Sequence, residues 1–524
     1  MPKPRSLAVA AATNWAAFAC AMGVSFFMAP YLIRGLGDAR YGVWCVVEGI
    51  LAYFTLLDMG VAACLVRFVA RHHAAGERDE LNRLVSACLA VFLAAAGAVV
   101  VVGAALVPVV APGLERKLGE SGDIPAFMLL MLANLAAALP LSVFPTLLDG
   151  LQRFGAKSAV RLLFLGLRVA GVVAVMETGP GLLRLAVVFT ITNLLEHAAA
   201  AVLAYRYLPG LHISRGLVDR ETLKRVRGYS VDSFLAMLAG RITVQTGAVV
   251  VGGLLTVTAA AHYAVAARLV ETAKGLLRSA TTTLTPAVSA REATGDLAGV
   301  RRVFLDGTRW VLYLVLPIHL GLLAFGRPFL ARWVGGEEYA DHCFPTAAIL
   351  STTLTIGVAQ SVAARILYGM GRLRLFARLA LVEAALNLGL SLGLVGPYGL
   401  EGVAAAVAGP NLLFCVFAIG YAAWVLEVGA GTYLRSAWLR PLLAAVVPAA
   451  VWWAVTPAAA TWAAIAFGIA CGLAPYALAV AVLEVLTARK PAARSAVVWA
   501  SGAAGSLPGA EARPRVSLSA RDAG

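Results

Sequence analysis

The sequence predicts an all-α polytopic membrane protein of about 14 transmembrane helices, and three observations lead to this fold class. The first is composition: 60% of the 524 residues are hydrophobic, only 14% are charged, and the mean hydropathy is +0.83. Soluble domains contain about 45–50% apolar and about 25% charged residues. A long soluble chain divides into domains and cannot hide this much apolar surface. The composition therefore excludes a soluble enzyme, a disulfide-stapled secreted protein and a disordered regulator.

The second observation is the number of apolar runs. A membrane-crossing helix needs about 20 mostly apolar residues, and the chain contains about fourteen such runs. The first run follows Lys3 and Arg5, but it is longer than the roughly 7–15 apolar residues of a signal peptide, so we expect an uncleaved helix. The predicted spans, in order, are 7–33, 42–69, 84–108, 125–149, 160–176, 183–205, 229–256, 262–288, 307–326, 343–368, 376–395, 402–425, 441–458 and 461–487.

The third observation is the position of the basic residues. With the N-terminus assigned to the cytoplasm, 29 of the 43 Lys and Arg residues fall on the inner side and 7 on the outer side. Cytoplasmic loops collect Lys and Arg, so this asymmetry predicts that both termini are cytoplasmic. It also accounts for the net charge of +15, which in a soluble chain would suggest nucleic-acid binding. We therefore expect no nucleic-acid partner.

An internal duplication organises the chain. Residues 76–83 recur in pattern at 295–302, and LLDGLQRF at 147–154 recurs as ILYGMGRL at 366–373, both at a shift of 219 residues. Because each repeat has six spans, an even number, both repeats start on the same side of the membrane and are parallel. Transporters place their substrate sites between such repeats. The chain is thus predicted to have a 6+6+2 plan: two parallel six-helix lobes at 1–228 and 229–428, two C-terminal transmembrane helices at 429–487, and a disordered cytoplasmic tail at 488–524.

Charged residues inside the spans are the candidate functional residues. A charge at the bilayer centre costs about 2.5–3.5 kcal/mol on insertion scales, so such residues normally face an interior. The spacings of three, three and four residues in span 8 place four side chains on one helical stripe. These four residues are Arg268, Glu271, Lys274 and Arg278. They form either the cationic wall of an aqueous cavity or, if the span starts later, a stripe at the headgroups.

Further candidates are scattered over other spans. Arg67 and Arg365 lie near span ends, as does Arg168, and snorkelling to the interface explains these three residues equally well. The complete set of substrate-binding candidates is Arg67, Arg241, Gln245, Arg268, Lys274, Arg278 and Arg365, and the ion-coupling candidates are Asp58, Glu271 and Glu383. Because basic residues outnumber acidic ones in this set, we expect an anionic substrate such as a phosphate or pyrophosphate, which the planar fork of Arg pairs well.

Signals for catalysis are absent from the sequence. It contains no G-x-S-x-G, no G-x-x-x-x-G-K-[ST] and no G-x-G-x-x-G motif. The seven cysteines include no C-x-x-C pair, and the seven histidines show no metal-ligand spacing. We therefore expect no enzyme activity, no catalytic residue, no metal and no cofactor. Transport would be driven by an ion gradient, by the membrane potential or by downstream consumption of the substrate.

Several segments resemble a known family. GLGDARYGVW, YFTLLDMGVAACLVRFVA and AAGERDELNRLV resemble the N-terminal region of Wzx-type oligosaccharide flippases, which are polysaccharide transporters of the multidrug/oligosaccharidyl-lipid/polysaccharide exporter superfamily. LLDGLQRF, AHYAVAARLVE, ILYGMGRLRLFA and EAALNLGLSLGLVGPYGLEGVA resemble later blocks, and the resemblance covers roughly residues 7–430. The family often has Q-T-D in span 7, whereas this chain has Gln245-Thr246-Gly247 and lacks the acidic residue.

The resemblance implies a flippase with two lobes that alternate access to a central cavity. Its substrate would be a polyprenyl-pyrophosphate-linked oligosaccharide, moved from the cytoplasmic to the outer leaflet of the bacterial inner (plasma) membrane for O-antigen, capsule or exopolysaccharide biosynthesis. We expect membrane lipids and a polysaccharide polymerase as partners, and a monomer. An ion-coupled multidrug or metabolite exporter of the same superfamily is the alternative. A polysaccharide polymerase or glycan ligase is a third possibility, which the short outer loops disfavour.

Overall fold

The computed structural model describes residues 4–58, 60–119, 123–281, 284–372, 374–456 and 461–488. Within these ranges the chain forms helices and short connections, with no strand. Long apolar runs favour helices because a helix satisfies its own backbone hydrogen bonds within one segment. The predicted tail begins at residue 488, where the last helix ends, and its remaining residues, 489–524, lie outside the described residues.

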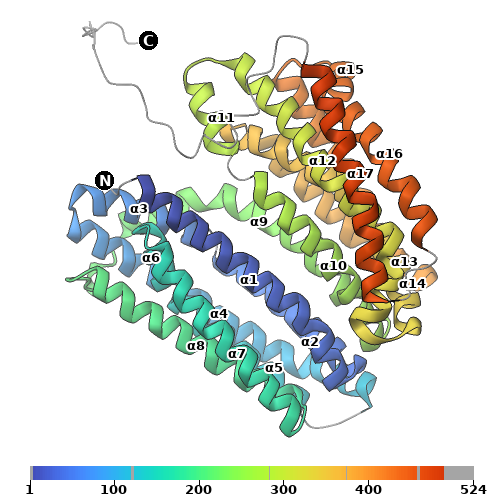
Figure 1. Ribbon diagram of the computed structural model, residues 1–524. Coiled ribbons are helices and arrows are strands. Elements are labelled where there is room, and N and C mark those ends of the chain that lie inside the picture. Colours follow the sequence, from blue (N-terminus) through green and yellow to red (C-terminus); the bar gives the residue numbers. More distant parts are fainter. Residues whose placement is uncertain are drawn as a thin grey trace, which may run out of the picture.

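The first bundle contains eight α-helices that make six passes, because two of the passes are broken into two helices each (Figure 1). Its elements are α1 (Pro4–Leu36), α2 (Asp38–Phe54), the 3₁₀ helix η1 (Thr55–Asp58), α3 (Val61–Ala75), α4 (Arg78–Leu118), α5 (Ile124–Leu141), α6 (Val143–Gly150), α7 (Phe154–Thr178) and α8 (Leu182–Tyr207).

A linker that contains η2 (Arg215–Leu217) leads to the second bundle. The elements of the second bundle are α9 (Arg220–Leu254), α10 (Val257–Thr281), α11 (Leu284–Ala293), α12 (Leu297–Leu330), η3 (Ala331–Gly335), α13 (Glu337–Gly369), α14 (Arg374–Val425), α15 (Ala430–Tyr433), η4 (Leu434–Trp438), α16 (Leu439–Val455) and α17 (Trp462–Ala488). The predicted boundary between residues 228 and 229 falls inside α9.

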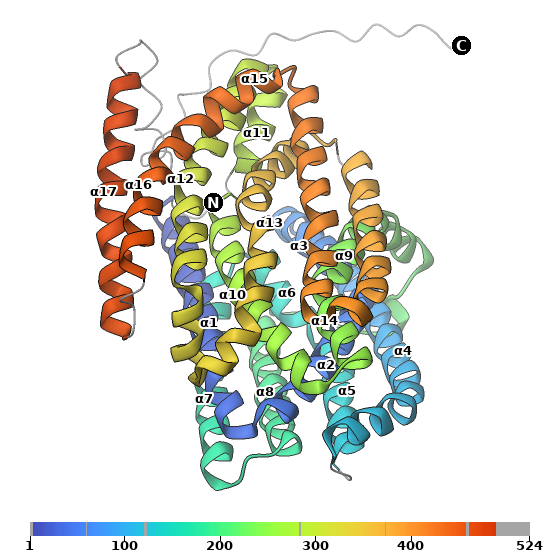
Figure 2. The ribbon, with the colours of Figure 1, turned by 90° about the vertical axis from the view of Figure 1, so that its right-hand side faces the viewer.

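Helix α14 is a hairpin of two arms. Gly399 has φ 54° and ψ −134°, a conformation that glycine adopts without strain, and the chain reverses there. The amide of Asn411 donates a hydrogen bond to Glu383 Oε1 at 3.4 Å although 28 residues separate them. A straight helix would place these residues about 42 Å apart. Figure 2 shows the two arms side by side, so α14 supplies two passes, as the break between spans 376–395 and 402–425 predicted.

The number of passes agrees with the sequence prediction. Eleven segments of the described residues are long and apolar enough to cross a membrane, and one of these is the α14 hairpin. Helix α9, which has a shorter apolar stretch at Leu238–Leu254, and the charged helix α10 complete the set. The predicted all-α polytopic fold is therefore confirmed.

The duplication is visible in the packing of two glycines. A methyl group built on Gly150 would lie 2.7 Å from Val69 Cγ1 and 2.8 Å from Val69 Cβ. A methyl group built on Gly369 would lie at the same two distances from the same two atoms of Val288. Since both pairs are related by the shift of 219, the same helix crossing is built twice. This confirms the register that the sequence predicted.

The two bundles share one hydrophobic core at one end of the molecule. We call this the joined end: it is where α1 ends, α2 and α10 begin and α12 ends, and its core combines residues such as Trp44 and Phe127 with Trp333 and Tyr339. Toward the opposite, separated end, the buried apolar residues form two clusters, each made by one bundle. Figure 1 shows the helices of the bundles diverging in this direction.

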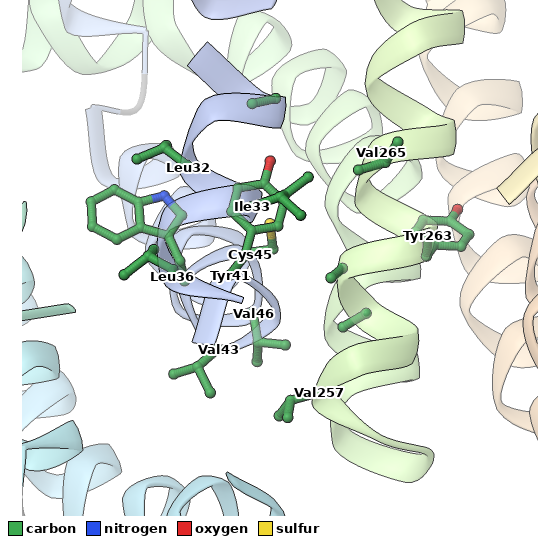
Figure 3. Close-up of a cluster of buried hydrophobic side chains, with 14 of the residues drawn as sticks. Leu32, Ile33, Leu36, Tyr41, Val43, Cys45, Val46, Val257, Tyr263 and Val265 are labelled. Carbon is green, nitrogen blue, oxygen red and sulfur yellow. The ribbon is translucent and has the colours of Figure 1, made fainter. Parts of the chain in front are cut away.

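Helices α2 and α10 approach closely at the joined end. A methyl group on Gly42 would overlap the carbonyl oxygen of Val257, so only glycine fits between the two backbones. Figure 3 shows Val43 and Val46 of α2 beside Val257 of α10. Any larger residue at position 42 would push the two bundles apart.

Candidate functional site

The charged stripe of span 8 lies on α10. This helix begins at Val257, five residues before the predicted span, so Arg268 stands eleven residues into the helix and about 16 Å along its axis. Arg268 therefore lies near mid-helix, and Arg278 lies in the last turn, toward the separated end. A late start of the span would have placed the whole stripe at the lipid headgroups. The helix starts earlier than predicted, so this alternative does not hold.

The stripe faces the first bundle. Arg268 donates hydrogen bonds from Nη1 to the hydroxyl of Ser25, at 2.8 Å, and to its carbonyl oxygen, at 3.2 Å. Two turns further, a methyl group on Gly275 would lie 3.7 Å from Met22 Cε. Ser25 and Met22 both belong to α1. This face of α10 therefore lies along the boundary between the bundles, which is where a shared transport path would run.

Glu271 is paired within the stripe. Its carboxylate accepts a hydrogen bond from Lys274 Nζ at 3.0 Å and lies 4.0 Å from Arg278 Nη1. Lys274 is buried, whereas about 40% of the side chains of Glu271 and Arg278 is exposed. One carboxylate thus serves two cations, and with Arg268 the stripe carries a net positive charge.

A second polar cluster lies inside the second bundle around Glu383, which is 5% exposed. Thr243 donates a hydrogen bond to Glu383 Oε2 at 2.8 Å, and Asn411 donates to Oε1 at 3.4 Å. Asn387, one turn beyond Glu383, is fully buried and accepts a hydrogen bond from Ser391 at 3.5 Å. The cluster joins α9 to both arms of α14. Sequence reasoning missed Asn411 and Ser391, although each is a polar residue within an apolar span.

The remaining candidates lie apart from these two clusters. Arg241 and Gln245 are half-buried on α9, and Arg365 is half-buried on α13. Within the described residues, no hydrogen bond or ion pair joins these three to the stripe. Arg67 is exposed on α3, with its guanidinium 5.9 Å from the ring centroid of Phe68. The side chain of the coupling candidate Asp58, at the end of η1, lies outside the described residues.

Arg168 makes an interaction that the sequence did not predict. Helix α7 begins at residue 154, six residues earlier than predicted, and Arg168 is an interior residue of this helix. Its Nε donates to the hydroxyl of Thr192 at 3.0 Å, and its Nη2 lies 3.5 Å from Glu196 Oε2. Snorkelling is therefore not needed to explain Arg168, which joins α7 to α8.

Gly247 stands where the resembling family often has an acidic residue. A methyl group on Gly247 would collide with the hydroxyl group and the ring of Tyr263, a buried residue of α10. The phenol thus occupies the space that an aspartate side chain would need. Packing against Tyr263 therefore explains why position 247 has no acidic residue. Within the described residues, Glu383 is a buried carboxylate that contacts α9, through Thr243.

Two cations of the first bundle bind the ends of helices in the second. Arg34 at the end of α1 donates from Nε to the carbonyl oxygen of Val334, at 3.0 Å, and from Nη2 to that of Trp333, at 3.3 Å. Lys117 at the end of α4 donates to the carbonyl oxygen of Gly252, at 2.8 Å. Carbonyl groups at a helix C-terminus carry partial negative charge, so these bonds fasten the joined end electrostatically.

Comparison with known proteins adds to this geometry. A profile of the family described as polysaccharide biosynthesis protein matches residues 12–291. The uncharacterized membrane protein EpsK of Bacillus subtilis (strain 168) is 30% identical over 79 residues, so the match spans 15% of each of the two chains.

Two solved structures share the fold. The lipid II flippase MurJ in an inward closed conformation is 12% identical, with a TM-score of 0.69, over 90% of this chain and 98% of that one. An inward-facing multidrug resistance MATE family transporter of the MOP superfamily is 14% identical, with a TM-score of 0.61, over 78% of this chain and 94% of that one. At these identities the similarity shows a common fold.

Proposed function

The chain belongs to the polysaccharide biosynthesis protein family, and from this premise we propose that it is a flippase for a polyprenyl-pyrophosphate-linked oligosaccharide. The substrate would pass from the cytoplasmic to the outer leaflet of the bacterial inner membrane and supply O-antigen, capsule or exopolysaccharide synthesis. The observation that carries the proposal is the net-positive stripe of α10, which faces α1 between the bundles.

The stripe suits the pyrophosphate in chemistry and in placement. Lys and Arg are the side chains that pair with phosphate oxygens, and Arg can bond two of them at once. Three cations follow one helix face from Arg268, near mid-helix, to Arg278, at the separated end. With the predicted topology, the separated end faces the cytoplasm. A pyrophosphate that arrives from the cytoplasmic side would meet Arg278 first and then move along the helix toward Arg268.

A buried carboxylate in the second bundle supports coupling to an ion. Glu383 accepts its hydrogen bonds from Thr243 and Asn411, which are both uncharged, and Lys274 of the stripe acts on it electrostatically from beyond hydrogen-bond distance. A buried carboxylate is costly unless it is protonated or paired, so uptake of a proton or a cation at Glu383 would lower that cost. Alternating uptake and release at this position would drive the exchange between inward-facing and outward-facing states. Glu271, by contrast, already has Lys274 and Arg278 as partners.

The test is a flipping assay in proteoliposomes. Purified protein is reconstituted with a polyprenyl-pyrophosphate oligosaccharide, and a membrane-impermeant reagent reports which leaflet holds the glycan. We expect the triple variant Arg268→Gln/Lys274→Gln/Arg278→Gln to lower the initial rate about tenfold or more, because even one charge-assisted bond to the substrate is worth this factor. The matched control is Arg116→Gln, which removes an exposed charge at the end of α4. If the triple variant flips at the native rate, the cationic path is wrong.

The alternative is an ion-coupled exporter of drugs or metabolites, since the fold is shared with a multidrug transporter. An exporter of organic cations would favour an acidic path, whereas the stripe contains three cations and one acid. The same vesicles loaded with a cationic dye separate the two functions. Dye efflux without glycan movement would favour the exporter, and we expect glycan movement without dye efflux.

A further inference from the structure

A cavity of about 180 Å³ lies in the first bundle at the separated end. It is open to the outside on one side and lined by the end of α3, the start of α4 and the chain that leaves α8, and Figure 1 shows α3 near the N-terminus at this end. None of the transport candidates lines it. The lining residues are His72, His73, Gly76, Arg78, Leu81, Asn82, Tyr207, Leu208, Pro209, Gly210 and Leu211.

The lining has one sign of charge. Arg78 and two histidines provide basic groups, and no acidic residue lines the cavity in the part of the chain that the structure describes. The neighbouring Glu77 is held by His72, whose Nδ1 lies 2.6 Å from Glu77 Oε2. His73 and Arg78 are exposed. The cavity therefore offers a cation, imidazole groups and peptide dipoles, which together recognise an anion.

The duplication supplies an internal comparison. At the shift of 219, Asn82 corresponds to Arg301 and Leu208 to Glu427. In the second bundle Arg301 bonds the carbonyl oxygen of Leu426 and the carboxylate of Glu427, so an ion pair occupies the equivalent place. The first bundle keeps the same helix ends but replaces this pair with a short amide and an apolar side chain. The cavity is therefore a feature of the first bundle that the duplicated fold does not itself produce.

The linker between the bundles forms one wall of the cavity. The Asn82 amide donates to the carbonyl oxygen of Gly210 at 3.3 Å, and its oxygen accepts from the backbone N–H of His212 at 3.1 Å. Gly210 and His212 lie in the segment that connects α8 to α9. A ligand in the cavity would thus touch both the first bundle and the only covalent connection between the bundles.

We propose that this cavity binds a phosphate ester at the predicted cytoplasmic face, outside the transport path. The ligand is either the headgroup of an anionic phospholipid or a soluble phosphorylated compound, since both present the same phosphate to Arg78 and His73. The proposal does not rest on the proposed function, because it uses none of the stripe residues and requires no flipping.

Two binding assays separate the sources of phosphate. Native mass spectrometry of the protein released from vesicles of phosphatidylglycerol and phosphatidylcholine measures which lipid is retained. Thermal unfolding in neutral detergent with glycerol 3-phosphate measures the soluble ligand. We expect Arg78→Gln to weaken binding about fivefold, which is the typical share of one basic residue facing an anionic surface. The matched control is Arg83→Gln, which removes the same charge from the same helix but does not line the cavity.

A third variant distinguishes the cavity from general charge attraction. Asn82→Arg adds a positive charge and places in the cavity the side chain that fills the equivalent position of the second bundle. General attraction predicts stronger binding in this variant, whereas occupancy of the cavity predicts its loss. The lipid source is supported if the native protein retains phosphatidylglycerol and the variants Arg78→Gln and Asn82→Arg do not. A shift with glycerol 3-phosphate and no lipid preference supports the soluble source.

The proposal is overturned by any of three results. These are equal weakening in Arg83→Gln, tighter binding in Asn82→Arg, or no phosphate-dependent signal in either assay. Thermal unfolding without ligand shows whether each variant folds. If Asn82→Arg does not fold, the comparison of Arg78→Gln with Arg83→Gln still decides the question.

Discussion

The cations that fasten the joined end set how easily the two bundles can separate there. Arg34 and Lys117 each donate to helix-end carbonyl groups of the opposite bundle. Hydrogen bonds from a charged group are worth about 1.5–3 kcal/mol, and a cation at a helix C-terminus about 0.3–1 kcal/mol. Both side chains are exposed, which screens the charge, so we take about 1 kcal/mol for each. Removing both should favour the state that is open at the joined end by about 2 kcal/mol, or about 30-fold.

Distances between spin labels measure this shift. Labels at Glu177, at the end of α7, and Glu338, at the start of α13, report the separation of the bundles at the joined end. Cys20 and Cys471, which are not buried and would also react with the label, are first replaced by alanine. Both glutamates are exposed, so labelling them removes no buried contact.

The expected result of the double variant Arg34→Ala/Lys117→Ala is a larger population at long distance. Arg116→Ala, which removes the neighbouring charge, should leave the distribution unchanged. An unchanged distribution in the double variant, or the same change in the control, refutes the reasoning.

Three further predictions follow from the packing and the buried charge. Glu383→Gln should remove the dependence of transport on an ion gradient while leaving the unfolding temperature close to native, and gradient-dependent flipping in this variant would exclude Glu383 as the coupling residue. Gly150→Ala and Gly369→Ala should each destabilise by about 1–3 kcal/mol, because the added methyl group meets a valine at the same distance in both repeats; tolerance of one but not the other in thermal unfolding would contradict the shared crossing. Gly247→Ala should unfold at a lower temperature than the native protein, since the methyl group collides with the Tyr263 ring, and native stability would show that the ring moves aside at little cost.

The sequence predicted those features that depend on local patterns. Apolar runs indicated every pass, including the break that α14 makes at Gly399, because the bilayer requires about 20 apolar residues from each pass regardless of its neighbours. The shift of 219 predicted the equivalence of Gly150 and Gly369, which depends on aligned sequence alone. The i, i+3, i+4 spacing likewise placed Arg268, Glu271, Lys274 and Arg278 on one stripe.

Contacts between distant parts of the chain could not be predicted in this way. Arg34 counted only as one of seven outer-side charges, yet its partner Val334 lies 300 residues away, and no periodicity links two such positions. The missing acid at Gly247 was visible, but its cause, the ring of Tyr263, depends on how α9 packs against α10. Snorkelling was considered for Arg168 because its partners, Thr192 and Glu196, lie on the next helix and no local pattern pairs them with it.

The duplication also gives a physical reason to expect ion coupling in the second bundle. The shift of 219 maps Arg168 onto Asn387. In the first bundle the guanidinium of Arg168 lies 3.5 Å from Glu196, so that carboxylate has a counter-ion of its own. In the second bundle a neutral amide occupies the equivalent position, and the hydrogen bonds that Glu383 accepts within the described residues come from a hydroxyl and an amide. A buried carboxylate without a bonded cation gains most from a proton or a mobile ion. Glu196 itself corresponds to Cys415, and Glu383 corresponds to Phe164, so the two lobes carry these carboxylates at different positions. We therefore expect reversible charge at Glu383 in the second lobe and a permanent ion pair at Glu196 in the first.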